Sequence, residues 1–377
     1  MIPLSLYIHI PWCIQKCPYC DFNSHKSPDE RPEKAYIQAL LADLRQDLER
    51  FPGRMLTSIF IGGGTPSLLS ASAYETLFTE LKALLSFQPE IEITLEANPG
   101  TVDESRFSDY HAVGINRLSL GIQSFNAHHL KLLGRIHDDQ QAHRAIERAR
   151  KAGFTNINLD IMHGLPNQSI QEGLSDLQAA LSHQPEHLSW YQLTIEPNTL
   201  FYKHPPMLPD DDTLGILEDE GFAMLAAHQF HRYEISAFSR ENRASKHNLN
   251  YWLFGDYLGI GAGAHGKLTT DAVYRTRKQR QPNDYLNATK PFMAEIIAIK
   301  PEELLFEFML NTTRLKQPIS HQLMTERTGL IWDDVKSVFE QAKTKGLITI
   351  DQDSWQVTPL GWRFANDLQA MFLGKLV

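Results

Sequence analysis

The three cysteines of this 377-residue chain lie close together, at Cys13, Cys17 and Cys20. Three thiols are too few for a disulfide framework and their number is odd, so their clustering predicts a metal site. Their CxxxCxxC spacing lets one loop wrap an iron-sulfur cluster, and a [4Fe-4S] cube held by three thiolates keeps one iron without a protein ligand. A metal needs such an open position in order to bind and activate another molecule.

Zinc is the alternative occupant of a site built on these cysteines. The three thiols lack a regularly spaced fourth ligand, although His9 or His25 could complete the set. Structural zinc sites are normally closed by four ligands. The residues alone therefore favour iron and sulfide and leave zinc open.

A glycine-rich segment, Gly62-Gly63-Gly64-Thr65-Pro66, follows the second expected strand. Glycines allow the backbone to approach a ligand closely and to adopt dihedral angles that other residues avoid. The segment is therefore a candidate binding loop, and a plain tight turn is the simpler interpretation when it is taken by itself.

The elements that must position these residues alternate between short apolar runs and helical patterns up to about residue 200, which is typical of parallel strands joined by crossover helices. The six expected strands are 4–10, 58–61, 91–95, 117–120, 156–160 and 187–194. Helical periodicity covers 36–48, 74–85 and 142–152. Six βα units fit a doubly wound sheet or an open barrel, and both place a site at the carboxyl ends of the strands, where the cysteines and glycines lie.

Beyond residue 205 the pattern loosens into an acidic helix and then a Tyr- and Gly-rich stretch over 247–266. Helical periodicity returns at 301–309, 319–328 and 333–345, followed by apolar strands at 347–350 and 355–357. We therefore expect three units. They are a barrel over 1–205, an extension over 206–298 that completes it, and a winged-helix-like α+β module over 299–377.

Composition narrows the class of protein. The chain is 42% hydrophobic and 21% charged, close to the globular average. Its formal net charge of -9 disfavours a general attraction to nucleic acid, which depends on Lys and Arg. No charged leader precedes the first expected strand, and no run of about 18 apolar residues occurs. We expect a cytoplasmic protein without a membrane-inserted segment.

The cysteine loop, including the aromatic Tyr19 before the last cysteine, resembles that of the radical S-adenosylmethionine (SAM) superfamily. The resemblance implies that Cys13, Cys17 and Cys20 hold a [4Fe-4S] cluster whose open iron is chelated by SAM. It also implies that the fold, α/β in class, is a partial (βα)6 barrel. The GGGTP segment at 62–66 resembles the family's segment of the same sequence, which contacts the methionyl amine of SAM.

Over nearly its full length the chain resembles the coproporphyrinogen-dehydrogenase-like subgroup of that superfamily. The resemblance implies SAM contacts from residues at strand ends. They are Tyr7, Gly63, Gly64, Thr65, Glu96, Gln123, Arg135 and Asp160, with the backbone of Phe22 at the adenine. For each residue, the alternative is an ordinary hydrogen-bonded strand end or helix cap.

The oxygen-independent dehydrogenases of this subgroup carry a further cysteine two positions after the triad and an N-terminal arm. Here Phe22 occupies the place of that cysteine, and three residues precede the first expected strand. Residues 247–252 instead resemble the HNxxYW segment of the HemW-type haem chaperones, as do 9–13 and 20–25. The resemblance implies a chaperone that binds haem and passes it to apo-haemoproteins, with a cluster and SAM site retained.

His247 of this segment is implied to be an axial haem ligand or a direct neighbour of haem. Imidazole suits haem iron, and Tyr251 and Trp252 offer flat apolar surface to a porphyrin. Arg275 and Arg277 could pair with the propionates. Without the resemblance, a histidine in such a region is more often a hydrogen-bonded turn residue. The other candidate ligands are His9, His25 and His265.

Two other functions stay open. One is that of an oxygen-independent coproporphyrinogen III dehydrogenase. The other is a radical SAM enzyme that modifies nucleic acid, supported by the basic run at 275–280 and the winged-helix-like tail. The sequence also leaves open whether SAM is cleaved in function, which haemoproteins receive haem (respiratory enzymes are candidates), and whether the chain forms a homodimer.

Overall fold

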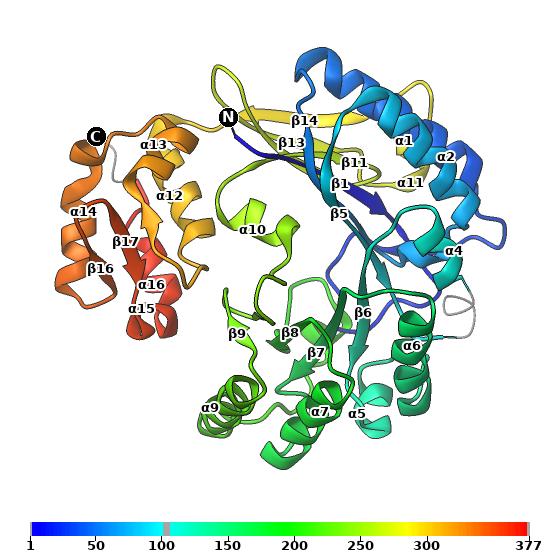
Figure 1. Cartoon of the computed structure of the whole chain (residues 1–377), viewed down its shortest axis with the longest axis horizontal. Helices are drawn as coiled ribbons and strands as arrows, with labels where there is room; N and C mark the ends of the chain where they lie inside the picture. Colours follow the sequence, from blue (N-terminus) through cyan, green and yellow to red (C-terminus); the bar gives the residue numbers. More distant parts are fainter. Residues whose placement is uncertain (1, 101–105, 375–377) are drawn as a thin grey trace.

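The computed structural model describes residues 2–100 and 106–374. Within these ranges it contains a 12-stranded sheet with the order β14-β13-β12-β11-β1-β4-β5-β6-β7-β8-β10-β9. The sheet curves into an open barrel with helices on its outer side (Figure 1). The strands from β1 to β8 in this order run parallel to one another. The α/β fold with a partial (βα)6 barrel is therefore confirmed.

The parallel strands are β1 (Leu4–Ile10), β4 (Leu56–Gly63), β5 (Phe87–Ala97), β6 (Arg117–Gln123), β7 (Ile157–His163) and β8 (His187–Gln192). The intervening helices are α1 (Glu33–Arg50), η1 (Pro66–Leu68), α2 (Ala71–Leu84), α4 (Phe107–Ala112), α5 (Ala127–Leu132), α6 (Asp139–Lys151) and α7 (Ile170–Ser182). All six strands expected from the apolar runs are confirmed, although the ends of the five strands after β1 shift by a few residues.

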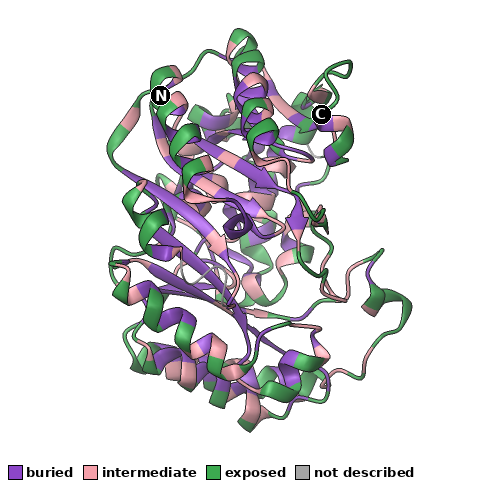
Figure 2. Ribbon diagram, turned by 90° about the vertical axis from the view of Figure 1, so that its right-hand side faces the viewer, coloured by how far each residue is buried: buried purple, intermediate pink, exposed green. Residues whose placement is uncertain are grey.

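Local signals explain where two of these helices begin. Asp138 caps α6 and Ser169 caps α7, each in a capping box in which the third helical residue bonds back to the cap. Such boxes satisfy backbone N–H groups that the first turn leaves unpaired. Strand β6 is buried at every position, because helices cover its outer face and the barrel interior its inner face. Figure 2 shows buried residues along the strands and exposed residues on the outer helices.

Residues after β8 extend the sheet at both edges. Beyond α8 (Leu200–Lys203) and α9 (Asp211–Ala227), the antiparallel strands β9 (His231–Arg232) and β10 (Ala237–Ser239) follow β8. Helix α10 (Lys246–Trp252) leads to β11 (Asp256–Ile260), which pairs in parallel with β1. The antiparallel strands β12 (His265–Thr269), β13 (Val273–Lys278) and β14 (Met293–Ala298) complete this edge, with α11 (Pro282–Tyr285) before β14.

The C-terminal module is built around a second apolar core, which includes Phe308, Phe339 and Trp355 and is shared with Phe254 and Val273 of the preceding segment. Its helices are α12 (Pro301–Thr312), α13 (His321–Thr328), α14 (Trp332–Thr344), α15 (Pro359–Arg363) and α16 (Ala365–Ala370). A sheet of β15 (Ile319–Ser320), β17 (Ser354–Val357) and β16 (Ile348–Ile350) packs with them. The helices and small sheet agree with the expected winged-helix-like module.

One boundary in this module differs from the sequence prediction. The helix expected over 319–328 begins at His321, because Ile319 and Ser320 form β15 and pair with β17. The Ser320 hydroxyl then accepts a hydrogen bond from the Leu323 N–H and caps the helix. In the described part of the chain, no helix combines the length and apolar character needed to cross a bilayer.

Candidate functional site

The cysteine loop follows the carboxyl end of β1. It is closed by the parallel pairing of β2 (Trp12–Cys13) with β3 (His25–Lys26), and within it the Cys20 N–H donates to the Cys17 carbonyl at 3.2 Å. Cys13, Cys17 and Cys20 all line one cavity of about 410 Å³. The loop therefore presents its three thiols to a common space at the end of the barrel.

The side chains of this cavity can be compared with the ligands that its two candidate occupants, zinc and a [4Fe-4S] cluster, require. Among the described residues, no three His, Cys, Asp or Glu side chains converge closely enough to hold a single metal ion. Structural zinc requires four ligands around one ion, whereas the cysteines of a [4Fe-4S] cluster bind different irons. Burial raises the pKa of the Cys13 and Cys20 thiols, so a bound metal would have to displace their protons. Three thiols that line one cavity fit a cluster with one open iron.

Polar side chains link two of the cysteines through hydrogen bonds. Thr65 Oγ1 donates to Cys13 Sγ at 3.6 Å, and Asn98 Nδ2 donates to Thr65 Oγ1 at 3.1 Å. Asn98 Oδ1 accepts from Arg135 Nη2 at 2.6 Å, and Arg135 Nη1 lies 3.7 Å from Cys17 Sγ. Arg135 Nε is buried and has no partner among the described residues. Because an unpaired buried donor is unfavourable, Arg135 is a strong candidate for a ligand contact.

Gly63 and Gly64 hold the end of β4 against the cysteine loop. Gly63 has a φ of 115°, which disfavours any other residue, and a Cβ there would lie 2.6 Å from the His9 ring. A Cβ on Gly64 would lie 2.5 Å from the Trp12 carbonyl oxygen. The Gly64 N–H donates to the Ile10 carbonyl at 2.7 Å. Both glycines are therefore needed for this close approach of two backbone segments.

Two buried acids face the same cavity. Glu96 Oε2 accepts from the Gly63 N–H at 3.1 Å, and burial, aided by the charge of Asp160, raises the pKa of Glu96 to about 8. Asp160 accepts from Ser119 Oγ at 3.0 Å and from Asn158 Nδ2 at 2.8 Å, and burial also raises its pKa. A cationic ligand would favour the ionised carboxylates, so the cavity is suited to positive charge.

Gln123, at the end of β6, has a φ of 71°, which is uncommon for a residue with a side chain. Its Oε1 accepts from the Tyr191 hydroxyl at 2.8 Å. Such conformations cluster at functional sites. Tyr191 and Asn98 also line the cavity but were not among the predicted site residues. The signal that could have identified them is their polar character at or beside the ends of predicted strands.

The structure brings most of the predicted SAM residues together. Those that line the 410 Å³ cavity are Phe22, Gly63, Gly64, Thr65, Glu96, Gln123, Arg135 and Asp160. Tyr7 instead lines a second cavity, of about 500 Å³, which adjoins the first and shares Phe22, Gly63 and Glu96 with it. Tyr7 therefore lies beside the predicted SAM contacts without facing the cysteines.

His247 lies on α10 and is 2% exposed, and the residues that line the two cavities do not include it. Its ring stacks on Phe60 with centroids 4.7 Å apart and meets Tyr251 edge-on at 4.2 Å. Burial lowers its pKa to about 3, so the ring is neutral. Phe60 and Tyr251 line the second cavity, so His247 lies directly behind that wall. Its contact with haem stays a prediction.

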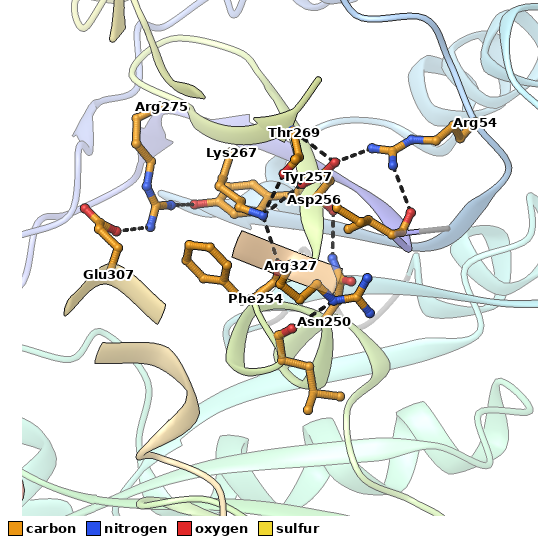
Figure 3. A network of polar contacts seen from close by, with 12 residues as sticks. Arg54, Asn250, Phe254, Asp256, Tyr257, Lys267, Thr269, Arg275, Glu307 and Arg327 are labelled. Atoms are coloured by element: carbon orange, nitrogen blue, oxygen red, sulfur yellow. Dashed lines mark hydrogen bonds and ion pairs between the residues drawn. The ribbon is translucent and has the colours of Figure 1, made fainter. Parts of the chain in front are cut away.

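The two arginines predicted near the propionates differ in their surroundings. Arg275 Nη1 donates to the Tyr257 hydroxyl at 3.0 Å, and its Nη2 lies 2.5 Å from Glu307 Oε2, so it joins β13 to α12 (Figure 3). Arg277 lines the second cavity, and its Nη2 lies 3.3 Å from Glu295 Oε2. Of the two, Arg277 is the one placed to meet a ligand there.

Comparison with known proteins gives family matches and close relatives. The radical SAM superfamily matches residues 7–179, and the HemN C-terminal domain matches residues 299–364. A protein of Haemophilus influenzae named heme chaperone HemW is 49% identical over 98% of this chain and 98% of its own length. The Escherichia coli protein of the same name is 48% identical over 99% of both chains.

Among solved structures, coproporphyrinogen III oxidase (HemN) from Escherichia coli, described as a radical SAM enzyme, matches with a TM-score of 0.83. The match covers 98% of this chain and 90% of that chain at 22% identity, so it shows the fold alone. The two curated relatives carry the family assignment. Because their identity extends over nearly the whole chain, the chain belongs to the HemW family of the radical SAM superfamily.

Proposed function

We propose that this chain is a haem chaperone, which binds haem and transfers it to apo-haemoproteins while carrying a [4Fe-4S] cluster and SAM. The observation that carries this proposal is the identity of 48% and 49%, over almost the full length, with two proteins named heme chaperone HemW. The site at the strand ends supports its cofactor part, because thiols, buried acids and an unpaired arginine donor line one cavity.

Cys13, Cys17 and Cys20 would hold the cluster, which supplies an open iron and an electron when bound. Thr65 and Arg135 would donate toward the sulfurs of Cys13 and Cys17, as they do in this structure. The hydrogen bond from Thr65 favours the Cys13 thiolate and opposes the effect of burial, which raises the pKa of that thiol. The loop and its two neighbouring side chains thus prepare the ligands for metal.

SAM would occupy the 410 Å³ cavity, whose volume lies in the usual range for small ligands, about 300–1,000 Å³. The buried acids Glu96 and Asp160 would stabilise its positive charges, and Arg135 its carboxylate. Gly63, Gly64, Thr65 and Gln123 complete the predicted contacts, with Phe22 at the mouth and Tyr7 beside Glu96. Whether SAM is cleaved is a separate question from haem transfer.

The remaining parts of the proposal concern organisation and partners. The units are the barrel over 1–205, the extension over 206–298 and the C-terminal module over 299–377, the last supported by an apolar core that lies mostly within it. We place the chain in the cytoplasm, with apo-haemoproteins as clients, respiratory enzymes among them. A homodimer is the oligomer to test first.

The test is anaerobic reconstitution with iron and sulfide, followed by parallel titration with haem and with coproporphyrinogen. The proposal expects a saturable Soret band with haem, no consumption of coproporphyrinogen, and movement of haem to an added apo-haemoprotein. Transfer must be faster than from free haem at the same concentration. Absence of haem binding or of transfer would overturn the proposal, and decarboxylated product would favour the dehydrogenase.

A further inference from the structure

We propose that haem binds in the second cavity, with the His265 imidazole as its axial ligand and with Arg277 and Arg280 paired to its propionates. This inference rests on the proposed function and names the site at which the cargo is held. It differs from the ligand predicted from the sequence, His247, which lies behind the wall of that cavity.

The second cavity has the size and walls that a porphyrin needs. Its volume of about 500 Å³ falls within the range of small-molecule sites. Aromatic side chains from five separate elements or loops line it: Tyr7, Phe22, Phe60, Tyr251 and Tyr257. Aromatic rings pack well against the flat face of another π-system. Phe22 is 59% exposed, so the cavity has an apolar residue at its mouth.

His265 is the first residue of β12 and lies just after the turn that connects it to β11. Gly261 and Gly263 have φ values of 103° and 80°, and the Ala264 N–H donates to the Gly261 carbonyl at 3.0 Å. This fixed turn places His265 in the cavity lining. Its side chain forms no hydrogen bond with another described residue. His265 is exposed, and partial desolvation together with the charges of Arg277 and Arg275 lowers its pKa, which favours the neutral imidazole that can bind iron.

His9, which also lines the cavity, has both ring nitrogens engaged. Its Nε2 lies 2.9 Å from the Asn23 carbonyl oxygen, which can only accept, so Nε2 carries the proton. The Tyr7 hydroxyl then donates to Nδ1 at 2.9 Å. Burial lowers the pKa of His9 to about 4, which excludes a second proton at neutral pH. Ligation by His9 would break two buried hydrogen bonds.

The other two histidines are less well placed. His25 Nε2 lies 3.1 Å from Asn23 Oδ1, and the described lining of the cavity does not include His25. The His247 ring is covered by Phe60 and Tyr251, so it would reach iron only if that wall opened. Among the histidines considered from the sequence, His265 alone combines access with an unengaged side chain.

Two arginines at the same cavity supply cations for two propionates. Arg277 lies directly opposite His265 in the β12–β13 ladder. Its ion pair with Glu295 joins side chains that are 51% and 44% exposed, so exchange of Glu295 for a propionate costs little. Arg280 lines the cavity, and its Nε lies 3.3 Å from Asn23 Oδ1. Arginine forks match carboxylates in geometry and charge.

Arg275 has a different role, since it holds the Tyr257 hydroxyl while pairing with Glu307 of α12 (Figure 3). It thereby fixes one aromatic wall of the cavity from behind. The second cavity also shares Phe22 and Glu96 with the cavity proposed for SAM. Haem and SAM would then lie side by side, and the binding of one would change the affinity for the other.

The first experiment titrates ferric haem into anaerobically reconstituted wild type, His265→Ala and His231→Ala. His231 is an exposed histidine on β9, at the opposite edge of the sheet, and serves as the matched control. We expect the Soret maximum and the paramagnetic signal of His265→Ala to differ from those of histidine-ligated iron, and its affinity for haem to be about ten-fold lower or more. Added imidazole should restore the signal of histidine-ligated iron. His231→Ala should match wild type. An unchanged signature in His265→Ala overturns the inference.

The second experiment tests the propionate partners. The double variant Arg277→Gln with Arg280→Gln should bind haem about ten-fold more weakly or worse, the size expected for lost charge-assisted hydrogen bonds. Haem dimethyl ester, which has no free propionate, should bind the double variant and wild type alike. Equal losses for both ligands would contradict the assignment, because they would indicate a damaged cavity.

These outcomes separate the inference from the function on which it rests. A wild-type protein that binds no haem contradicts the proposed function. A wild-type protein that binds haem, together with an unchanged His265→Ala, contradicts only the site. If His247→Ala removes the histidine signature while His265→Ala keeps it, the ligand is His247 and the inference is wrong.

Discussion

Lys267 Nζ lies 2.9 Å from Asp256 Oδ1, and both side chains are almost completely buried, at 1% and 0% exposure (Figure 3). Asp256 also pairs with Arg54 and accepts from Thr269 Oγ1 at 2.8 Å. Lys267 stands opposite Tyr257 in the β11–β12 pairing. The buried pair therefore supports the two strands that carry one wall of the second cavity.

Lys267→Met should destabilise the protein strongly, because it removes one partner of a buried carboxylate. We expect a loss of about 3–5 kcal/mol in the free energy of unfolding, measured by chemical denaturation. Lys290→Met is the matched control, since its pair with Asp284 is 45% and 39% exposed and should contribute less than about 1 kcal/mol. Similar losses for both variants would contradict this interpretation of the pair.

Cys17→Ala should abolish the [4Fe-4S] absorption and paramagnetic signal after reconstitution, while circular dichroism shows a folded barrel. The reason is that three thiols line the cavity and each would bind a different iron. Ser24→Ala is the control, because Ser24 Oγ lies 4.0 Å from Cys20 Sγ but offers no ligand of its own. A full cluster in Cys17→Ala would exclude Cys17 as a ligand.

The affinity for SAM should rise with pH up to about 8 because of Glu96. The pKa of this carboxyl in the unliganded protein is about 8, raised from 4.5 by burial and by Asp160. Below that pH a cationic ligand must first displace the proton, whereas above it the carboxylate is already charged. Calorimetric titration over pH 6–9 of wild type beside Glu96→Gln checks this, since the variant keeps the titration of SAM itself. Parallel pH profiles would remove Glu96 from the site.

The barrel could be predicted from the sequence because each of its strands is a short apolar run between helical patterns. Strand β1 was predicted to the residue at Leu4–Ile10. The pairing of Ile319 with β17 was missed, because two residues before a helix carry no periodicity of their own. The helices after β17 were also missed, since the short segments α15 and α16 give little repeat to detect.

The candidate site was likewise only partly predictable from the sequence. Residues at strand ends, such as Glu96 and Asp160, could be placed together because parallel strands end at one side of a barrel. The second cavity could not be foreseen, because its walls come from β1, β4, α10, β11 and β12, and only folding brings Phe60 beside Tyr251. The burial of His247 has the same cause, since its stacking partner lies on a distant strand.

The reconstituted protein should not convert coproporphyrinogen to protoporphyrinogen under anaerobic reducing conditions. Phe22, which lines both cavities, stands where the dehydrogenases were expected to carry a further cysteine and offers no thiol. Chromatography of the tetrapyrroles against a reaction without protein is the measurement. Haem binding by the same preparation is the positive control, and decarboxylated product above background would show that Phe22 does not prevent the reaction.

His247→Ala should weaken haem binding without changing the iron ligand. Its ring packs against Phe60 and Tyr251, so truncation leaves a void behind the cavity wall. Large-to-small core substitutions lower the free energy of unfolding by about 2–5 kcal/mol, and a wall loosened in this way should bind haem less tightly. His247→Phe keeps a ring in that stack and should retain most of the affinity, which separates packing from ligation. Haem titration of both variants, followed by Soret absorbance and electron paramagnetic resonance, checks this. If both variants lose the histidine signature while His265 is intact, His247 ligates the iron, and the wall formed by Phe60 and Tyr251 must open when haem binds.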